Sequence, residues 1–252
     1  MTAAWMRRTG AIAIAGAALA ALSACGGGGG GDETASPQGY WYDDTTIGVV
    51  TSDNEFWSLR TGGTELVLRH GTLATSGHSF SGVLDDFLIS AAGKTSVSTS
   101  GTFVPRSSLG GSSTSASGAT SAYTLRYDST YEQAATLAKA AGSWQAMLVS
   151  GNLTHQHTGT VASDGKLTMT SRSWITGSSP SGTGCTLTGT LTPDPAGGNF
   201  FRIAGQFGTS GCKAPNASVR GLVTVSTRNG TSVMTGGVLW NGEGMPLALL
   251  RS

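Results

Sequence analysis

The chain has 252 residues, and its 15 Lys and Arg residues nearly balance its 14 Asp and Glu residues, with a formal net charge of +1 at pH 7. This balance provides no electrostatic attraction to nucleic acid, so we expect no nucleic-acid partner. Only 12% of the residues are charged and 39 are glycine, a composition typical of exported all-β proteins with many turns.

The first 24 residues have the pattern of an export signal. Arg7 and Arg8 precede an apolar run at residues 11–22, which is too short to span a bilayer but suits a secretory signal. The run ends in LSAC, which resembles the bacterial lipobox and whose cysteine is Cys25. The resemblance implies that residues 1–24 are removed and that Cys25 carries lipid, such as palmitate. An ordinary signal with an incidental cysteine is the alternative.

The residues after Cys25 indicate the membrane in which the chain is expected to be anchored. Gly26 stands where many lipoproteins retained in the inner membrane have aspartate. The lipobox resemblance therefore implies a location in the cell envelope, at the outer membrane, with the membrane as partner through the lipid on Cys25. Residues 25–38 are glycine-rich, and we expect them to form a flexible tether.

Residues 39–128 are expected to form a first β-unit. Apolar and polar residues alternate along residues 47–52, and a turn is expected at residues 53–54, which together predict antiparallel strands. Residues 107–121 are rich in serine, glycine and threonine, which predicts a mobile loop inside this unit.

One short helix is predicted at about residues 130–141, leading into the second unit. Ser129 and Glu132 have the spacing of a capping box, in which the two side chains satisfy free backbone amides. Alanines dominate the segment, and Gly142 is placed to end it.

Residues 129–252 are expected to contain this helix and a second β-unit. The sequence GVVTSDNEFW, which begins at Gly48, matches GTVASDGKLT, which begins at Gly159, at four positions. This match predicts that the chain contains a duplicated β-unit. The predicted fold is all-β, with two consecutive small antiparallel β-units that are barrel-like or sandwich-like.

Two cysteines remain once Cys25 is assigned to lipid. Cys185 and Cys212 form an even pair in a chain expected in an oxidising compartment, which predicts a disulfide. A metal site built on both cysteines is the alternative, but no further cysteine or histidine is close to them in the sequence.

A G-x-W sequence begins each β-unit, and an arginine stands near the end of each. These features resemble the lipocalin and wider calycin barrels, in which the arginine covers the tryptophan and closes one barrel end. The resemblance implies the pairs Trp41 with Arg126 and Trp144 with Arg251. Tryptophans that simply fill two β-cores are the alternative.

A longer segment carries a second resemblance. The sequence TLRYDSTYEQAATLAKAAGSW, followed by GCTLTGTLTP and a second cysteine, resembles two-part, β-rich proteobacterial lipoproteins. That resemblance implies the architecture and an envelope location, and it implies no chemistry.

The sequence offers no catalytic constellation. Gly77-His78-Ser79-Phe80-Ser81 departs from the hydrolase elbow at its fifth residue and reads as strand. His155 and His157 could share one strand face as metal ligands do, but residues 152–156 read as a polar loop with solvated histidines. We therefore expect no enzyme activity, no cofactor and no metal.

Two hypotheses for function follow. The leading one is a non-enzymatic, outer-membrane-anchored binding or envelope-associated module, with an envelope protein as a possible partner. The alternative is a lipocalin-like carrier of a small apolar ligand in a barrel interior. Trp174 and Trp240 border turns and are the candidate contact residues for a ligand or partner.

Overall fold

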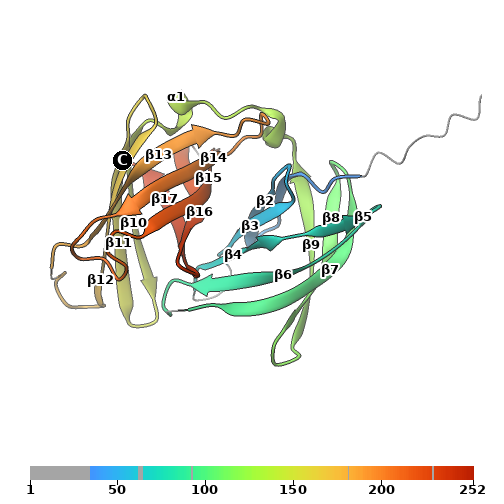
Figure 1. Cartoon of the computed structure of the whole chain (residues 1–252), viewed down its shortest axis with the longest axis horizontal. Helices are drawn as coiled ribbons and strands as arrows, with labels where there is room; N and C mark the ends of the chain where they lie inside the picture. Colours follow the sequence, from blue (N-terminus) through green and yellow to red (C-terminus); the bar gives the residue numbers. More distant parts are fainter. Residues whose placement is uncertain (1–34, 62–64, 92, 181, 229) are drawn as a thin grey trace, which may run out of the picture. The chain divides into compact units, whose positions relative to one another are not determined.

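The computed structural model describes residues 35–61, 65–91, 93–180, 182–228 and 230–252. Cys25 and most of the expected tether lie outside these residues. Thr34–Ser252 is one compact unit, and it contains two consecutive antiparallel β-barrels (Figure 1). This confirms the predicted all-β fold class, and both units are barrels rather than sandwiches.

The first barrel has eight strands in the spatial order β4-β3-β2-β1-β9-β8-β7-β6, and the pairing of β4 with β6 closes it. A further short strand, β5, continues along β6 beyond β4. The strands are β1 (Gly39–Tyr42), β2 (Thr46–Val50), β3 (Glu55–Arg60), β4 (Val67–Thr72), β5 (Ala74–Ser76), β6 (Ser79–Leu88), β7 (Thr95–Val104), β8 (Ser108–Ser115) and β9 (Thr120–Asp128).

The second barrel has eight strands in sequence order, and β17 pairs with β10 to close it. Its strands are β10 (Gly142–Ser150), β11 (Leu153–Val161), β12 (Lys166–Ile175), β13 (Cys185–Pro193), β14 (Phe201–Phe207), β15 (Ser218–Arg228), β16 (Thr231–Trp240) and β17 (Glu243–Arg251). Alternation sets the inward face of each strand. On β14, for example, Phe201, Ile203 and Phe207 are buried.

The predicted loop at residues 107–121 is wrong, because most of this segment forms β8 and β9. Small residues fit here because the strands approach closely. Gly111 lies directly opposite Gly101 on β7, and a Cβ on Gly111 would lie 2.3 Å from a backbone oxygen of Ser100. Composition alone suggested a loop, but pairing with β7 satisfies the backbone of the segment.

The predicted helix at residues 130–141 is broken into two short turns. These are a 3₁₀ helix, η1 (Ser129–Glu132), and the helix α1 (Leu137–Ala140). Asp128, not Ser129, caps η1 through its carboxylate. Tyr131 is buried in the core between the barrels, and Ala135 packs into the second barrel's core. These tertiary contacts override the helical propensity of the alanines.

The two G-x-W sequences occupy equivalent positions. Trp41 and Trp144 are buried, and each indole Nε1 donates 2.8 Å to the carbonyl oxygen four residues earlier, at Pro37 and Ala140. Each tryptophan also lies opposite a glycine on the next strand, Gly48 or Gly159. These glycines are the first residues of the two matching sequence stretches. Residues 35–38, assigned to the tether from the sequence, therefore contact the first barrel.

The arginine partners differ between the barrels. Arg251 lies opposite Trp144 on β17, and its guanidinium carbon is 4.9 Å from the ring centroid. The predicted pair of Trp41 with Arg126 is wrong. The register places Tyr127 opposite Trp41, so Arg126 points to the other face and covers Tyr42.

The disulfide between Cys185 and Cys212 is confirmed. It ties the start of β13 to the loop between β14 and β15. The closed loop has a sequence separation of 27 residues, for which chain entropy predicts about 3 kcal/mol of stabilisation.

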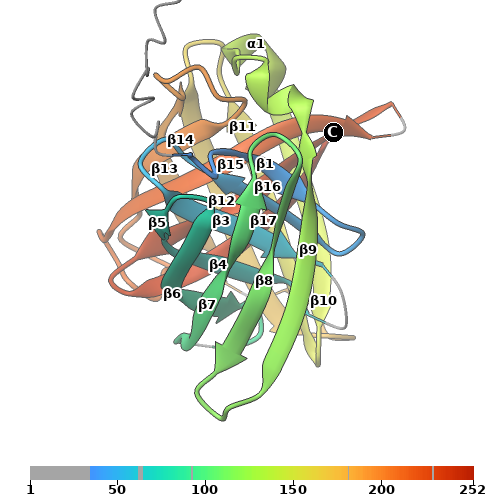
Figure 2. The same ribbon diagram turned by 90° about the vertical axis from the view of Figure 1, so that its right-hand side faces the viewer.

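A third core joins the two barrels, which lie side by side (Figures 1 and 2). It is built from outward-facing residues of both barrels together with residues of the connecting segments, and it is distinct from the two barrel interiors. Its members are Tyr40, Val49, Trp57, Leu68, Phe87, Tyr131, Phe200, Leu222 and Leu239.

Glycine permits the close approach of the two barrels at this core. A Cβ on Gly237 of β16 would lie 2.4 Å from Leu68 Cδ2, whereas a Cβ on Gly110 of β8 would meet nothing closer than 3.6 Å. We expect Gly237→Val to destabilise the protein by about 1–3 kcal/mol through overpacking. Gly110→Val is the matched strand control and should cost less. Urea denaturation measures both, and equal losses would contradict this account of the interface.

Candidate functional site

The second barrel opens into a cavity of about 650 Å³. It occupies the barrel end away from Trp144, where the side chains no longer fill the interior. Its apolar wall includes Leu153, Phe207, Trp240 and Met245. Trp240 stands edge-on to Phe207, with the ring centroids 5.1 Å apart. A cavity of this size is typical of small-molecule sites.

Two histidines are among the polar residues of this wall. His155 and His157 lie on the inward face of β11, and they are only 6% and 2% exposed. His155 Nδ1 is 2.8 Å from Ser173 Oγ, and His157 Nδ1 is 2.8 Å from Ser171 Oγ. Both Nε2 atoms are buried without a hydrogen-bond partner. The site therefore holds two imidazoles with one nitrogen each left unsatisfied.

Burial keeps these imidazoles neutral near pH 7. Desolvation lowers the pKa of His155, and it lowers the pKa of His157 to about 4, with a smaller contribution from the neighbouring His155. A neutral imidazole has one donor and one acceptor nitrogen. When the serine hydroxyls accept from Nδ1, each buried Nε2 is the acceptor nitrogen of its ring.

The rim of the cavity comes from both barrels. Residues 88–91 of the first barrel contribute to the lining, as do Lys213 and Glu243 of the second. Lys213 Nζ is 3.3 Å from Glu243 Oε1, and Glu243 also accepts from Gly93 N at 2.9 Å. Because the disulfide at Cys212 adjoins Lys213, it holds this part of the rim near the mouth.

The first barrel has a cavity of its own, of about 400 Å³. Its wall includes a closed polar network. Arg69 makes two contacts to Asp86, at 2.6 and 2.9 Å, and donates to Ser113 Oγ at 2.9 Å. Tyr123 Oη lies 2.7 Å from Thr99 Oγ1. The guanidinium of Arg69 is thus held by protein partners.

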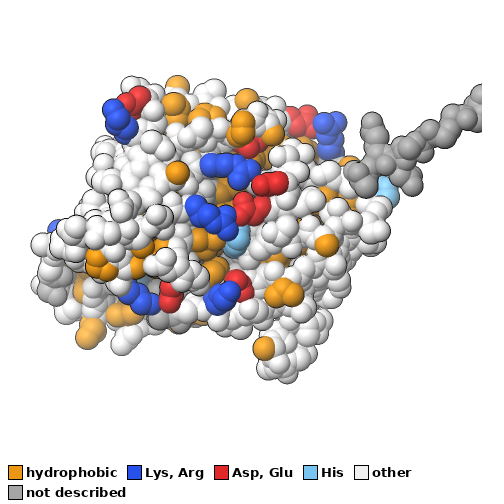
Figure 3. Space-filling model, in the orientation of Figure 1, with side chains coloured by type: hydrophobic (Ala, Val, Ile, Leu, Met, Phe, Trp, Pro, Cys, Tyr) orange, Lys and Arg blue, Asp and Glu red, His pale blue; other side chains and the backbone are white. Residues whose placement is uncertain are grey.

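The seam between the barrels holds an ionic cluster. Glu55 Oε1 on β3 is 2.8 Å from His70 Nε2 and 2.5 Å from Arg220 Nη1 of the second barrel. Burial raises the pKa of Glu55, but the hydrogen bonds from His70 and Arg220 outweigh it and lower this pKa to about 2. Figure 3 shows basic and acidic side chains beside a histidine near the middle of this face.

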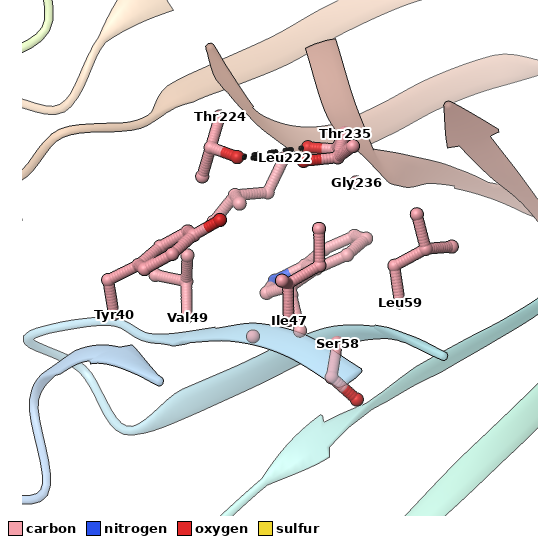
Figure 4. A pocket seen from close by; sticks show the side chains of 11 residues that line it. Tyr40, Ile47, Val49, Ser58, Leu59, Leu222, Thr224, Thr235 and Gly236 are labelled. Atoms are coloured by element: carbon pink, nitrogen blue, oxygen red, sulfur yellow. Dashed lines mark hydrogen bonds between the residues drawn. The ribbon is translucent and has the colours of Figure 1, made fainter. Parts of the chain in front are cut away.

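The small opening at the seam is filled by packed side chains and is too small for an organic ligand. Its volume is about 10 Å³, room for about one water molecule. Figure 4 shows side chains of the two barrels pointing toward one another across it. The labelled residues on the two sides include Tyr40, Val49 and Ile47 of the first barrel and Leu222, Thr224 and Thr235 of the second.

The residues singled out from the sequence fall in different places. Trp240 lines the cavity of the second barrel, and Trp174 is partly exposed on β12, where it lies opposite Thr154. Trp41 and Trp144 are core residues. Cys25 is not among the described residues.

The expectation of solvated histidines in a loop is wrong. β11 begins at Leu153, so His155 and His157 are in a strand and face its interior. The alternation of Leu153, His155, His157, Gly159 and Val161 is the signal that could have shown this. The polar composition of residues 152–156 suggested a loop instead of a strand.

Comparisons with protein-family models, with curated proteins and with solved structures each found no match to this chain. Among the residues that the structure places, no helix has the length and apolar character needed to cross a bilayer. The described residues also contain no group of three or more His, Cys, Asp or Glu side chains arranged to hold a metal ion. The geometry of the site is therefore the basis for its function.

Lowering the pH from 7 toward 4 is expected to destabilise the protein partly through His157. Its folded-state pKa is about 4, below the ordinary value of 6.5, so the unfolded chain takes up the proton first as the pH falls. The stability that this group contributes at pH 7 is lost as the pH falls from about 6.5 to 4. The largest loss is about 3 kcal/mol.

Urea midpoints at pH 7 and pH 4.5 measure this effect. His157→Gln should reduce the pH dependence between these values, whereas His78→Gln, at an exposed turn, should leave it unchanged. An identical pH dependence in wild type and His157→Gln would contradict the assignment.

Proposed function

We propose that this chain is a non-enzymatic binding module that takes up a small, largely apolar molecule in the mouth of its second barrel. The single observation that carries the proposal is the cavity of about 650 Å³ whose wall combines apolar side chains with the imidazoles of His155 and His157. Cavities of about 300–1,000 Å³ suit drug-sized molecules. The lipocalin-like alternative considered from the sequence is thus the function that the geometry supports best.

The lining favours an amphipathic ligand over a strongly charged one. The aromatic rings of Phe207 and Trp240 and the thioether of Met245 offer apolar contact. Polar side chains of the lining, among them Ser90 and Thr183, offer hydrogen bonds to a polar end. Lys213 and Glu243 at the rim pair with each other, and the lining also includes Arg172. A neutral or negative polar end therefore fits this lining better than a positive one.

We also propose that the module is tethered to the cell envelope, at the outer membrane, through lipid on Cys25. The support is the LSAC sequence behind an apolar run and the glycines that follow it. An acyl chain contributes about 0.8 kcal/mol per buried CH₂, so two or more chains hold a protein firmly at a membrane.

A partner protein is a second candidate, favoured by exposed apolar side chains on β10 and β12. Met147 and Val149 on β10 are 65% and 60% exposed, and Ile175 on β12 is 62% exposed. Trp174 is next to Ile175 and partly exposed. Val149 and Trp174 both lie opposite Thr154 of β11 and so flank it on one sheet face. Exposed apolar side chains grouped on one face are a feature of interaction surfaces.

Ligand uptake can be tested with the fluorescent apolar probe N-phenyl-1-naphthylamine. We expect saturable binding to the full chain, with energy transfer from Trp240. Met245→Trp places a larger ring in the cavity and should weaken binding at least tenfold. Met147→Trp is the matched control on the outer surface and should bind as wild type does. Absence of saturable binding, or equal binding by both variants, would refute the proposed cavity function.

The anchor is tested separately by metabolic labelling with a palmitate analogue. Wild type is expected to incorporate the label and Cys25→Ala to lose it, because the thiol is the proposed acylation site. Cys212→Ala is the control for loss of a different cysteine. Labelling that persists in Cys25→Ala would remove the anchor from the proposal.

A further inference from the structure

The cavity of the first barrel contains polar groups that the pair of Arg69 and Asp86 does not engage. Phe56, Ser58 and Arg60 occupy alternate positions on β3, and all three line this cavity of about 400 Å³. Alternate residues of a strand share one face. The inward face of β3 therefore presents a phenyl ring, a hydroxyl and a guanidinium in a row, over about 13 Å of strand.

Ser58 is a buried polar residue whose side chain lacks a partner. It is only 6% exposed, and its hydroxyl makes no hydrogen bond within the described part of the chain. Ser58 Oγ is not one of the fully enclosed polar atoms, so it has contact with the cavity. Figure 4 shows this oxygen pointing away from the residues of the second barrel. A ligand that bonds to the hydroxyl would offset the cost of leaving it unpaired.

Arg60 is the charged group of this lining that is left for a ligand. Its side chain is exposed, and it has no ion-pair partner among the residues that the structure places. The two acids of the lining are engaged elsewhere. Asp86 holds Arg69, and Asp43 accepts from two backbone N–H groups of its own turn, each at 2.7 Å. A free guanidinium is suited to bind a carboxylate through two parallel hydrogen bonds.

We propose that the first barrel binds a small carboxylate with an apolar body, whose acidic group pairs with Arg60 at the mouth and whose body lies in the cavity against Phe56. This site is separate from the cavity of the second barrel. It does not rest on the function proposed for that cavity, and it gives the two barrels ligands of different chemistry.

The deeper part of the lining fits the apolar body. Phe56, Leu84, Val97 and Leu125 all line the cavity, and none is more than 7% exposed. A volume of about 400 Å³ is within the range of about 300–1,000 Å³ that small-molecule sites occupy. The lining contains both Arg60 and Asp43, so a single acidic group suits it better than two.

The probe 8-anilinonaphthalene-1-sulfonate tests this site. It is N-phenyl-1-naphthylamine with an added sulfonate, which stands in for the carboxylate. The titrations use the full chain with Met245→Trp, which narrows the cavity of the second barrel. We expect saturable binding of one equivalent. Adding Arg60→Gln should weaken it at least fivefold, whereas adding Arg126→Gln, on the outer face over Tyr42, should not change it.

A second pair of variants tests the location. Ser121 alternates with Tyr123 and Leu125 on β9 and lines the cavity. Ser121→Trp should fill part of the space and weaken probe binding at least tenfold. Thr124→Trp places the same ring on the outer face of the strand and should have no effect. Ser121 and Thr124 are both exposed, so both variants are expected to fold.

Competition tests the preference for an acid. The carboxylate 4-phenylbutyrate should displace the probe, and its neutral analogue 4-phenylbutanol should not. Equal binding with and without Arg60→Gln, equal displacement by the alcohol, or binding that Ser121→Trp leaves unchanged would each overturn the inference. Binding of N-phenyl-1-naphthylamine by wild type reports on the second barrel, so failure of one proposal is distinguishable from failure of the other.

Discussion

The pairing of β10 with β17 is the contact on which the candidate site depends, because it closes the second barrel. Two ladder pairs make it, Trp144 with Arg251 and Gln145 with Leu250, and Ser252 N donates to Ser143 O at 3.1 Å beside them. Arg251 covers the Trp144 ring, and its guanidinium also donates to the carbonyl oxygen of Lys139 in α1. The indole of Trp144 is in turn held by the carbonyl of Ala140. One barrel end is thus sealed by side chains and by the helical connection, and the space at the other end remains open.

The first barrel contributes to the site from outside. The apolar core between the barrels and the Glu55 cluster hold the two barrels together, so residues 88–91 can line the cavity of the second barrel. The ligand pocket is therefore a property of the pair of barrels. The two interiors also differ in chemistry, since the ion pair of Arg69 with Asp86 occupies one and two unpaired imidazole nitrogens occupy the other.

Much of the fold could be predicted because it depends on local patterns. Alternation along residues 47–52 and the turn expected at residues 53–54 predict strands, and an even pair of cysteines predicts a disulfide. The predictions that were wrong are those in which a distant part of the chain sets the register or the packing. The arginine expected over Trp41 is displaced by one residue of register, and a register shift of one residue reverses the face of every side chain. The alanine-rich helix is interrupted because Tyr131 and Ala135 find partners in two different cores.

The sequence by itself determined the strand periodicity, the repeated G-x-W starts, the pair of Cys185 and Cys212 and the LSAC pattern that ends at Cys25. These are local features, and adjacent residues suffice to define them. Only the tertiary structure decided that the units are closed barrels, that His155 and His157 are buried in one of them, and that a cavity is open beside them. Whether an inward side chain fills a barrel or lines a cavity depends on the residues opposite it, which come from strands far away in the chain. That information is absent from any short stretch of sequence and appears only when β17 meets β10.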